Sequence, residues 1–219
     1  MHLAYRLSFL RRARNPDRYT SAMVTRDQVL KNIDSLIQRV PPLQCTLARL
    51  EETSIRYGLY AGSHVAVLTN NRPPTDVDFL VHDDDIDELK TIFPSARSNE
   101  SESATLLYVD DNNLIEFMAR ANIHMEGAVY PFRLTDLAYQ HEDTYNARLG
   151  TIKIVNTVDT LLLKAVLRRG KSQGKHDLED IQSVLAQTEL DKEYLEARLE
   201  ETNTREFTAE VWHGLGIQV

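Results

Sequence analysis

Two short segments of the sequence carry residues with a capacity for chemistry. The dipeptide Gly62-Ser63 precedes Thr75-Asp76-Val77-Asp78, in which two carboxylates are spaced at i and i+2. Side chains alternate across a β-strand, so Asp76 and Asp78 are expected on the same face. Two carboxylates held side by side repel each other and need a compensating cation. The spacing therefore indicates a divalent metal that carries phosphates.

A third carboxylate, Glu116, is the candidate that completes this site. It lies inside the apolar segment Leu114-Ile115-Glu116-Phe117-Met118, where an unpaired buried charge would be costly. If this segment is a strand beside the Asp strand, Glu116 faces the same metal pocket. The alternative is an outward-facing Glu on an edge strand. Asp110 and Asp111 are rival candidates, but they lie in a segment typical of a turn.

Three carboxylates would hold two divalent ions, and we expect Mg²⁺, with Mn²⁺ as the alternative. Magnesium suits an all-oxygen site. Such ions lower the pKa of an attacking hydroxyl and stabilise a leaving pyrophosphate. Attack at the α-phosphorus of a nucleoside triphosphate would then transfer a nucleoside monophosphate. The seven His residues show no metal-ligand spacing, which counts against a metal-dependent phosphohydrolase.

Further residues are candidates for binding the nucleotide. Gly62 and Ser63 at a strand-to-helix turn would hold a phosphate oxygen, although such a dipeptide is also a common turn. Lys164 stands among leucines, and Arg168 follows one helical turn later, so the pair would hold the β- and γ-phosphates. The alternative for both is a cation extending along a surface helix. Asp180 would orient Lys164 or the nucleotide, whereas Asp177 would simply cap its helix.

These segments resemble the nucleotidyltransferase superfamily related to DNA polymerase β. Gly62-Ser63 followed by Asp76-Val77-Asp78 is similar to the motif of its small stand-alone members. The stretch Val158-Asp159-Thr160-Leu161-Leu162-Leu163-Lys164-Ala165 and the stretch Lys175-His176-Asp177-Leu178-Glu179-Asp180-Ile181 resemble the helical half of AbiEii-type and related minimal members. The resemblance covers about residues 57–186.

The resemblance implies a role for each matching residue. Asp76 and Asp78 would bind the metals, with Glu116 as the third acid. Ser63 would contact a phosphate, and the side chains of Lys164 and Asp180 would complete the nucleotide site. Two departures concern the subgroup and the acceptor: His176 interrupts the usual Lys-Asp pair, and the Arg-Gly that follows Gly-Ser in many minimal members is missing.

The activity that the resemblance implies is Mg²⁺-dependent transfer of a nucleoside monophosphate from ATP or another NTP to a hydroxyl acceptor. Members of the superfamily modify tRNA ends, proteins or antibiotics, so the acceptor is expected to be tRNA, a protein or a small molecule. Some members are toxins or antitoxins. The alternative is therefore a catalytically silent protein of this fold that serves as a toxin-antitoxin or regulatory binding partner.

The elements that must position these residues alternate between helices and short strands. The order predicts an α+β fold, with a small mixed sheet flanked by helices and a helical C-terminal part. We expect an N-terminal arm over 1–24, a nucleotidyltransferase domain over 25–156 and a helical subdomain over 157–219. The expected elements are helices at 26–39, 43–56, 64–68, 86–93, 157–169 and 177–185, strands at 57–61 and 76–81, and hairpins at 105–118 and 144–155. Asp83-Asp84-Asp85 is expected to cap a helix, and residues 94–103 to form a loop.

Composition adds broad limits. Hydrophobic residues make up 42% and charged residues 26% of 219 residues, which is ordinary for a globular protein. No apolar run is long enough to span a bilayer, and the single Cys45 fits a reducing compartment, so we expect a cytoplasmic protein without membrane contact. A net charge of -8 argues against broad nucleic-acid binding. The Arg-rich first twenty residues predict a short arm, with an organelle transit peptide as the alternative.

Overall fold

The computed structural model describes residues 23–74, 76–110, 112 and 114–219. Most of the expected N-terminal arm therefore lies outside the described residues. The helices are α2 (Arg26–Arg39), α3 (Pro41–Glu51), α4 (Ala61–Thr69), α5 (Ile86–Ile92), α6 (Asp136–Gln140), α7 (Thr157–Leu167), α8 (Asp177–Leu185), α9 (Lys192–Glu201) and α10 (Arg205–Gly214), with a short 3₁₀ helix η2 (Lys171–Gln173). The strands are β1 (Tyr57–Tyr60), β2 (Val77–Val81), β3 (Arg97–Glu100), β4 (Thr105–Tyr108), β5 (Ile115–Ala119), β6 (Asn122–Met125), β7 (Ala128–Pro131), β8 (Asp143–Ala147) and β9 (Gly150–Ile154).

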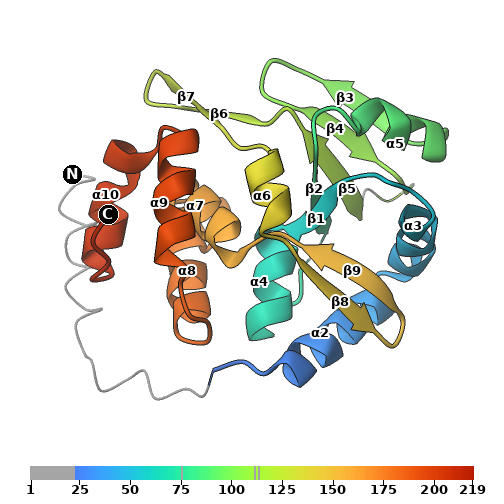
Figure 1. Ribbon diagram of the computed structural model, residues 1–219, viewed down its shortest axis with the longest axis horizontal. Coiled ribbons are helices and arrows are strands. Elements are labelled where there is room, and N and C mark those ends of the chain that lie inside the picture. Colours follow the sequence, from blue (N-terminus) through green and yellow to red (C-terminus); the bar gives the residue numbers. More distant parts are fainter. Residues whose placement is uncertain (1–22, 75, 111, 113) are drawn as a thin grey trace.

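Seven of these strands form one mixed sheet in the order β3-β4-β5-β2-β1-β9-β8. Strand β2 runs parallel to β5 and antiparallel to β1, while β1 runs parallel to β9. Strands β6 and β7 pair only with each other, and their hairpin projects from the body at the top of Figure 1. This mixed sheet with surrounding helices confirms the expected α+β class.

The sheet buries a stack of aromatic rings. Phe79 of β2 and Phe117 of β5 are cross-strand partners, and their ring centroids lie 5.0 Å apart. Phe93, directly after α5, stacks on Phe117 at 5.9 Å. These rings exclude water from the centre of the sheet, and their burial fixes the register of β2 against β5.

Helix α4 connects the sheet to the C-terminal helices. It packs against β1 and β2, and against α7 and α8 on its other side. Figure 1 shows α4 between the sheet and the group formed by α7, α8, α9 and α10. One cluster of buried apolar side chains extends from Val29 in α2 to Trp212 in α10. The core is therefore continuous across residues 156 and 157, and the expected domain boundary stays an interpretation.

Several expected elements are present with shifted ends. Thr25 caps α2 by accepting a hydrogen bond from the backbone N–H of Gln28, as expected. Helix α3 begins at Pro41 rather than at 43, because proline is well suited to the first position of a helix. Both expected hairpins form, as β4 with β5 and β8 with β9.

One expectation about residues 83–103 held in position only, and another was wrong. Asp85 is the N-cap residue of α5, as expected, but it makes no side-chain capping hydrogen bond, because its carboxylate accepts from the backbone and side chain of Arg56. Asp83 instead accepts from the backbone N–H of Arg120 at 2.7 Å. The expected loop contains β3, a polar edge strand that pairs with β4. The carboxylates of Asp83 and Asp85 therefore connect this region to Arg120 and Arg56, which are distant in the sequence.

Among the described residues, no helix combines the length and the apolar character that crossing a membrane requires.

Candidate active site

Two of the three candidate acids lie in one row across the sheet, while Asp76 directly precedes β2. Asp78 of β2 is the direct partner of Glu116 in β5. The same row continues to Tyr60 of β1 beside Asp78, and to Tyr108 of β4 beside Glu116. Direct partners on neighbouring strands project to the same face. The predicted meeting of the Asp strand with the Glu116 strand is therefore confirmed, and two tyrosines flank the two acids.

Burial and like charge act together on these carboxyl groups. Burial, followed by the charges of Asp76 and Glu116, raises the pKa of Asp78 to about 7. Burial and the charge of Asp76 also raise the pKa of Glu116, against a hydrogen bond from Tyr108 that lowers it. The charge of Asp76 acts on both other acids, so the three lie in one electrostatic neighbourhood.

The acids suit a hard divalent cation, although they are not arranged around one. In the part of the chain that the structure describes, no three or more His, Cys, Asp or Glu side chains are grouped closely enough to hold a metal ion as they stand. Within that same part, no ion pair involves Asp78 or Glu116. Burial is the largest cause of the raised pKa of both carboxyls, and like charge adds to it. An all-oxygen donor set of this kind matches what Mg²⁺ binds, provided that the side chains turn toward one another.

The Gly62-Ser63 segment forms the first turn of α4. Ser63 is fully buried, and its hydroxyl donates to the backbone C=O of Tyr60 at 2.8 Å. The same hydroxyl accepts from the backbone N–H of Asp78 at 3.3 Å. Ser63 thus ties the end of β1 to the start of β2 and holds Asp78 in position. A phosphate contact for Ser63 stays a prediction.

An unusual backbone conformation marks the same turn. Ala61, rather than a glycine, has a positive φ of 53°. This left-handed conformation is uncommon for alanine and occurs preferentially where a turn is fixed by its surroundings. Gly62 is exposed, and a Cβ atom added there would meet nothing within 4 Å. The open space beside Gly62 leaves its backbone accessible to a ligand.

Lys164 and Asp180 form part of a chain of alternating charges. The Nζ atom of Lys164 is buried and donates to Asp180 at 2.8 Å and to Asp177 at 3.2 Å. Asp177 does not cap α8, because it accepts instead from the backbone and side chain of Arg169. The contact between Lys164 and Asp180 that the sequence predicted is present. It joins α7 to α8.

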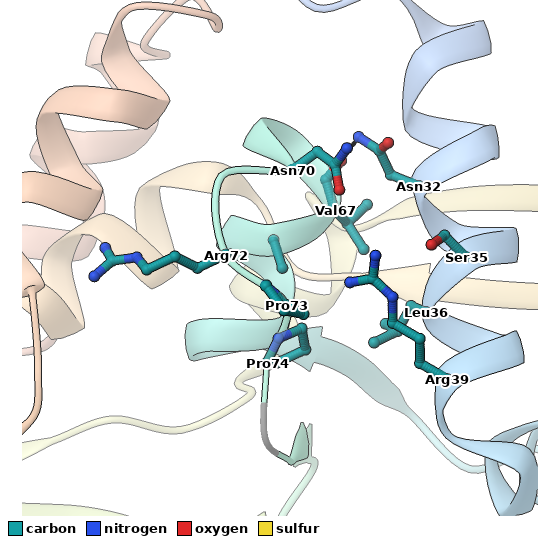
Figure 2. A pocket seen from close by; sticks show the side chains of 10 residues that line it. Asn32, Ser35, Leu36, Arg39, Val67, Asn70, Arg72, Pro73 and Pro74 are labelled. Carbon is teal, nitrogen blue, oxygen red and sulfur yellow. Dashed lines mark hydrogen bonds between the residues drawn. The ribbon is translucent and has the colours of Figure 1, made fainter.

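Arg72 extends this chain of charges to the segment that leads into the acidic strand. It lies between α4 and β2, and it pairs with the carboxylate of Asp180. Figure 2 shows its side chain pointing away from a hollow between α2 and α4, and toward the C-terminal helices. The loop that carries Asp76 is therefore anchored to α8 through Arg72 and Asp180. No pattern in the sequence predicts this contact, because its partners are far apart in the chain.

Arg168 follows the end of α7 and is not part of the helix. The helix ends at Leu167, and Arg168 adopts a left-handed conformation with φ 47° as the residue after it. Its guanidinium lies 4.3 Å from the ring centroid of Phe207 in α10. The expectation that Arg168 continues the helical face of Lys164 was wrong, because the helix does not extend that far. Its phosphate role stays a prediction.

Two further residues near the acids were not predicted. Lys175 lies between α7 and α8, and its positive charge lowers the pKa of Asp78 more than that of Lys164 does. The hydroxyl of Tyr60 is buried without a hydrogen-bond partner among the described residues. The charges that act on it come from Asp159, Arg198 and Asp78. Lys175 begins one of the segments that carry the family resemblance, but no role was assigned to it, and nothing in the sequence distinguishes Tyr60 from an ordinary core tyrosine.

Comparisons with known proteins give structural likenesses at low identity. No protein-family model and no curated protein sequence matches the chain. The antibiotic-resistance factor ANT(2″)-Ia in complex with adenylyl-2″-tobramycin shares 15% identity, with a TM-score of 0.48 over 77% of this chain and 99% of that one. The lincosamide antibiotic adenylyltransferase LnuA, bound to lincomycin, shares 17% identity, with a TM-score of 0.46 over 67% and 96% of the two chains. An antigenic nucleotidyltransferase-like protein from Paracoccidioides brasiliensis shares 17% identity, with a TM-score of 0.43 over 85% and 94%.

Proposed function

We propose that this protein is a Mg²⁺-dependent nucleotidyltransferase that moves a nucleoside monophosphate from an NTP to a hydroxyl acceptor. The observation that carries the proposal is the direct pairing of Asp78 with Glu116 on adjacent strands, with the charge of Asp76 acting on both. Three acids in one place repel one another, and a divalent cation would remove that repulsion. Among the described residues, no other two acids that are direct partners on neighbouring strands both have a raised pKa.

In the proposed site, Asp76, Asp78 and Glu116 hold the metal, with Mg²⁺ or Mn²⁺ as the ion. The bound ion supplies charge stabilisation for a triphosphate and lowers the pKa of a hydroxyl next to it. The hydroxyl of Ser63 accepts a hydrogen bond from the backbone N–H of Asp78 and so holds the backbone of that residue. The hydroxyl of Tyr108 donates a hydrogen bond to Glu116, which favours the charged form of that carboxylate. The residues of the chain itself thus fix where the carboxylate oxygens point.

The nucleotide would lie between the acidic row and the C-terminal helices. The exposed backbone at Gly62 is open to a phosphate oxygen, and Ser63 belongs to the same turn. Lys164 and Asp180 would border this site, and their ion pair, which joins α7 to α8, would hold that border in place. Arg168 would reach the nucleotide only from the side of α7 that α10 covers. A hydroxyl acceptor would approach from the solvent side of Asp76, which is exposed.

A catalytically silent binding protein of the same fold is the second candidate. The observation that favours it is that the described His, Cys, Asp and Glu side chains form no ready-made metal site. Such a protein would act as a toxin-antitoxin or regulatory partner and would use its surface rather than the acidic row. The exposed, free thiol of Cys45 fits a cytoplasmic location for either candidate.

The direct test is transfer of label from each of the four NTPs. Purified protein and Mg²⁺ are incubated with NTP labelled at the α-phosphate and, in parallel, with NTP labelled at the γ-phosphate. The acceptor pools, tested separately, are tRNA, the protein itself and aminoglycosides. The proposal expects label from the α-phosphate, and none from the γ-phosphate, in one pool. Label from the γ-phosphate would indicate a kinase-like reaction. No transfer to any pool, with intact nucleotide binding, would favour the silent candidate.

A further inference from the structure

Of the three acids in the proposed site, Asp76 alone lies outside a strand. Strand β2 begins at the next residue, Val77, whose backbone N–H donates to the C=O of Leu114 at 2.7 Å. Asp78 and Glu116 lie inside the paired strands and are direct partners in their ladder. The position of the Asp76 carboxylate therefore depends on the loop between α4 and β2 as well as on the sheet.

The described part of that loop, residues 70–74, lies beside a hollow. Asn70 ends α4 in a left-handed conformation, and its backbone N–H donates to the C=O of Ala66 at 2.8 Å. Pro73 and Pro74 have no backbone N–H, so they cannot donate a hydrogen bond that would fasten the loop. Both prolines line the hollow between α2 and α4, an open space of about 240 Å³ (Figure 2). Because of that space, helix α2 supports the loop incompletely.

Arg72 holds the loop from the other side. Its guanidinium pairs with the carboxylate of Asp180 in α8, and Figure 2 shows the side chain pointing away from the hollow. Asp180 is itself fixed, because it accepts from the buried Nζ of Lys164 at 2.8 Å and its side chain is 13% exposed. Asp76 follows four residues after Arg72, and two of the intervening residues are prolines with a restricted φ. The ion pair thus constrains where Asp76 can lie.

Neutralising Asp180 does not require Arg72. Lys164 already contacts that carboxylate, and the second acid around Lys164, Asp177, is also paired with Arg169. The Arg72 side chain is 43% exposed, and an ion pair of such exposure contributes little to stability. The contact is therefore better explained by the position that it gives the loop than by the stability that it adds.

We propose that Arg72 is a positioning residue for the metal site: through its ion pair with Asp180, it sets where the Asp76 carboxylate meets the ion. This inference rests on the proposed function, which it deepens by linking the metal-binding loop to α8. An ion binds more tightly when its ligands are held in place beforehand. A positive charge in this loop would by itself oppose a cation. Removal of Arg72 therefore weakens metal binding if the residue positions Asp76, whereas loss of charge alone would strengthen it.

The test measures affinity for Mn²⁺ alone, followed through the electron paramagnetic resonance of the free ion. We expect Arg72→Met to weaken Mn²⁺ binding about fivefold, and Arg72→Lys to recover part of that loss. The matched control is Arg205→Met, because the Arg205 side chain is also 43% exposed and pairs with Glu196 between α9 and α10. The control should bind Mn²⁺ like the wild type. Arg72→Met and the control should both melt within about 3 °C of the wild type.

The variant Asp76→Asn tests whether Arg72 acts through Asp76. In that background Arg72→Met should cause no further loss of Mn²⁺ affinity, because the carboxylate that Arg72 positions has been removed. An equal loss in both backgrounds would overturn the assignment of Arg72 while the proposed function stands. Unchanged or tighter Mn²⁺ binding by the single variant Arg72→Met would do the same, as would weaker binding together with a markedly lower melting temperature. If the wild type binds no Mn²⁺, the proposed metal site and the assignment of Arg72 are both wrong.

Discussion

Asp78 and Glu116 are direct partners in the parallel pairing of β2 with β5. The sequence places them in separate segments, and only the alignment of the two strands brings their carboxyl groups together. Both groups are partly withdrawn from water, and both have a raised pKa. Such an arrangement lowers the stability of the metal-free protein, so it is expected where the acids serve a ligand.

The orphaned hydroxyl of Tyr60 gives a prediction about stability. Because this buried hydroxyl has no described partner, Tyr60→Phe should leave the free energy of unfolding unchanged or raise it by up to about 1 kcal/mol. The matched control is Tyr194→Phe, since the Tyr194 hydroxyl donates to the buried carboxylate of Asp159 at 2.9 Å. That variant should lose about 1.5–3 kcal/mol. Urea unfolding of both variants measures the difference, and equal losses would contradict the expectation for Tyr60.

His64 predicts a pH dependence of stability. Burial lowers its pKa to about 3, and its Nδ1 atom lies 3.0 Å from the hydroxyl of Thr160. The unfolded chain binds a proton at this His near pH 6.5 and the folded chain does not, so stability is retained above that pH and declines below it. The contribution from His64 should fall by about 2 kcal/mol between pH 7 and pH 5.

The variant His64→Asn isolates this effect, because asparagine can keep a hydrogen bond to Thr160 and does not titrate. Urea unfolding at several pH values should show a shallower pH slope between 7 and 5 in the variant than in the wild type. Parallel slopes would mean that His64 titrates normally in the folded protein.

The buried ammonium of Lys164 gives a third prediction. Lys164→Met leaves the carboxylates of Asp177 and Asp180 without their shared cation, so the free energy of unfolding should fall by about 3 kcal/mol. Arg169 and Arg72 still neutralise these two carboxylates in part. The exposed pair of Lys171 with Glu179 is the control, and Lys171→Met should lose less than about 1 kcal/mol. Similar losses from both variants would contradict the buried role of Lys164.

The sequence predicted the elements that have a clear local signal. The alternation of Asp76, Asp78 and the apolar residues between and after them specified a strand, and Thr25 specified the start of α2. The two hairpins followed from turn residues between apolar segments. These signals act over a few residues, so they are readable without knowledge of the distant contacts.

Features decided by distant partners were not predictable in the same way. Strand β3 consists of Arg97, Ser98, Asn99 and Glu100, all exposed, and it exists because β4 offers it an edge. Asp85 had the residue type of a helix cap, but Arg56, far away in the chain, offered a stronger charged contact. In each case a through-space partner overrode the local preference.

The candidate site shows the same division. The residue types and spacing predicted that Glu116 meets the Asp strand, and gave contact with Lys164 as one of two roles for Asp180; both contacts are present, while the metal-binding role of the acids stays a prediction. The sequence did not show that Lys164 is enclosed between two aspartates, nor that Arg72 reaches Asp180. Both facts depend on how α7 and α8 pack, which no local pattern reports.

The central claim is that the three acids bind a metal-nucleotide complex, and removal of two of them tests it. Calorimetric titration with an NTP in Mg²⁺ is carried out on the wild type and on the double variant Asp76→Ala with Asp78→Ala. The variant is expected to remain folded and to melt at the same or a higher temperature, because like charges have been removed. The account predicts that Mg²⁺-dependent binding is present in the wild type and absent from the variant. Equal heats and affinities in the two proteins would contradict it.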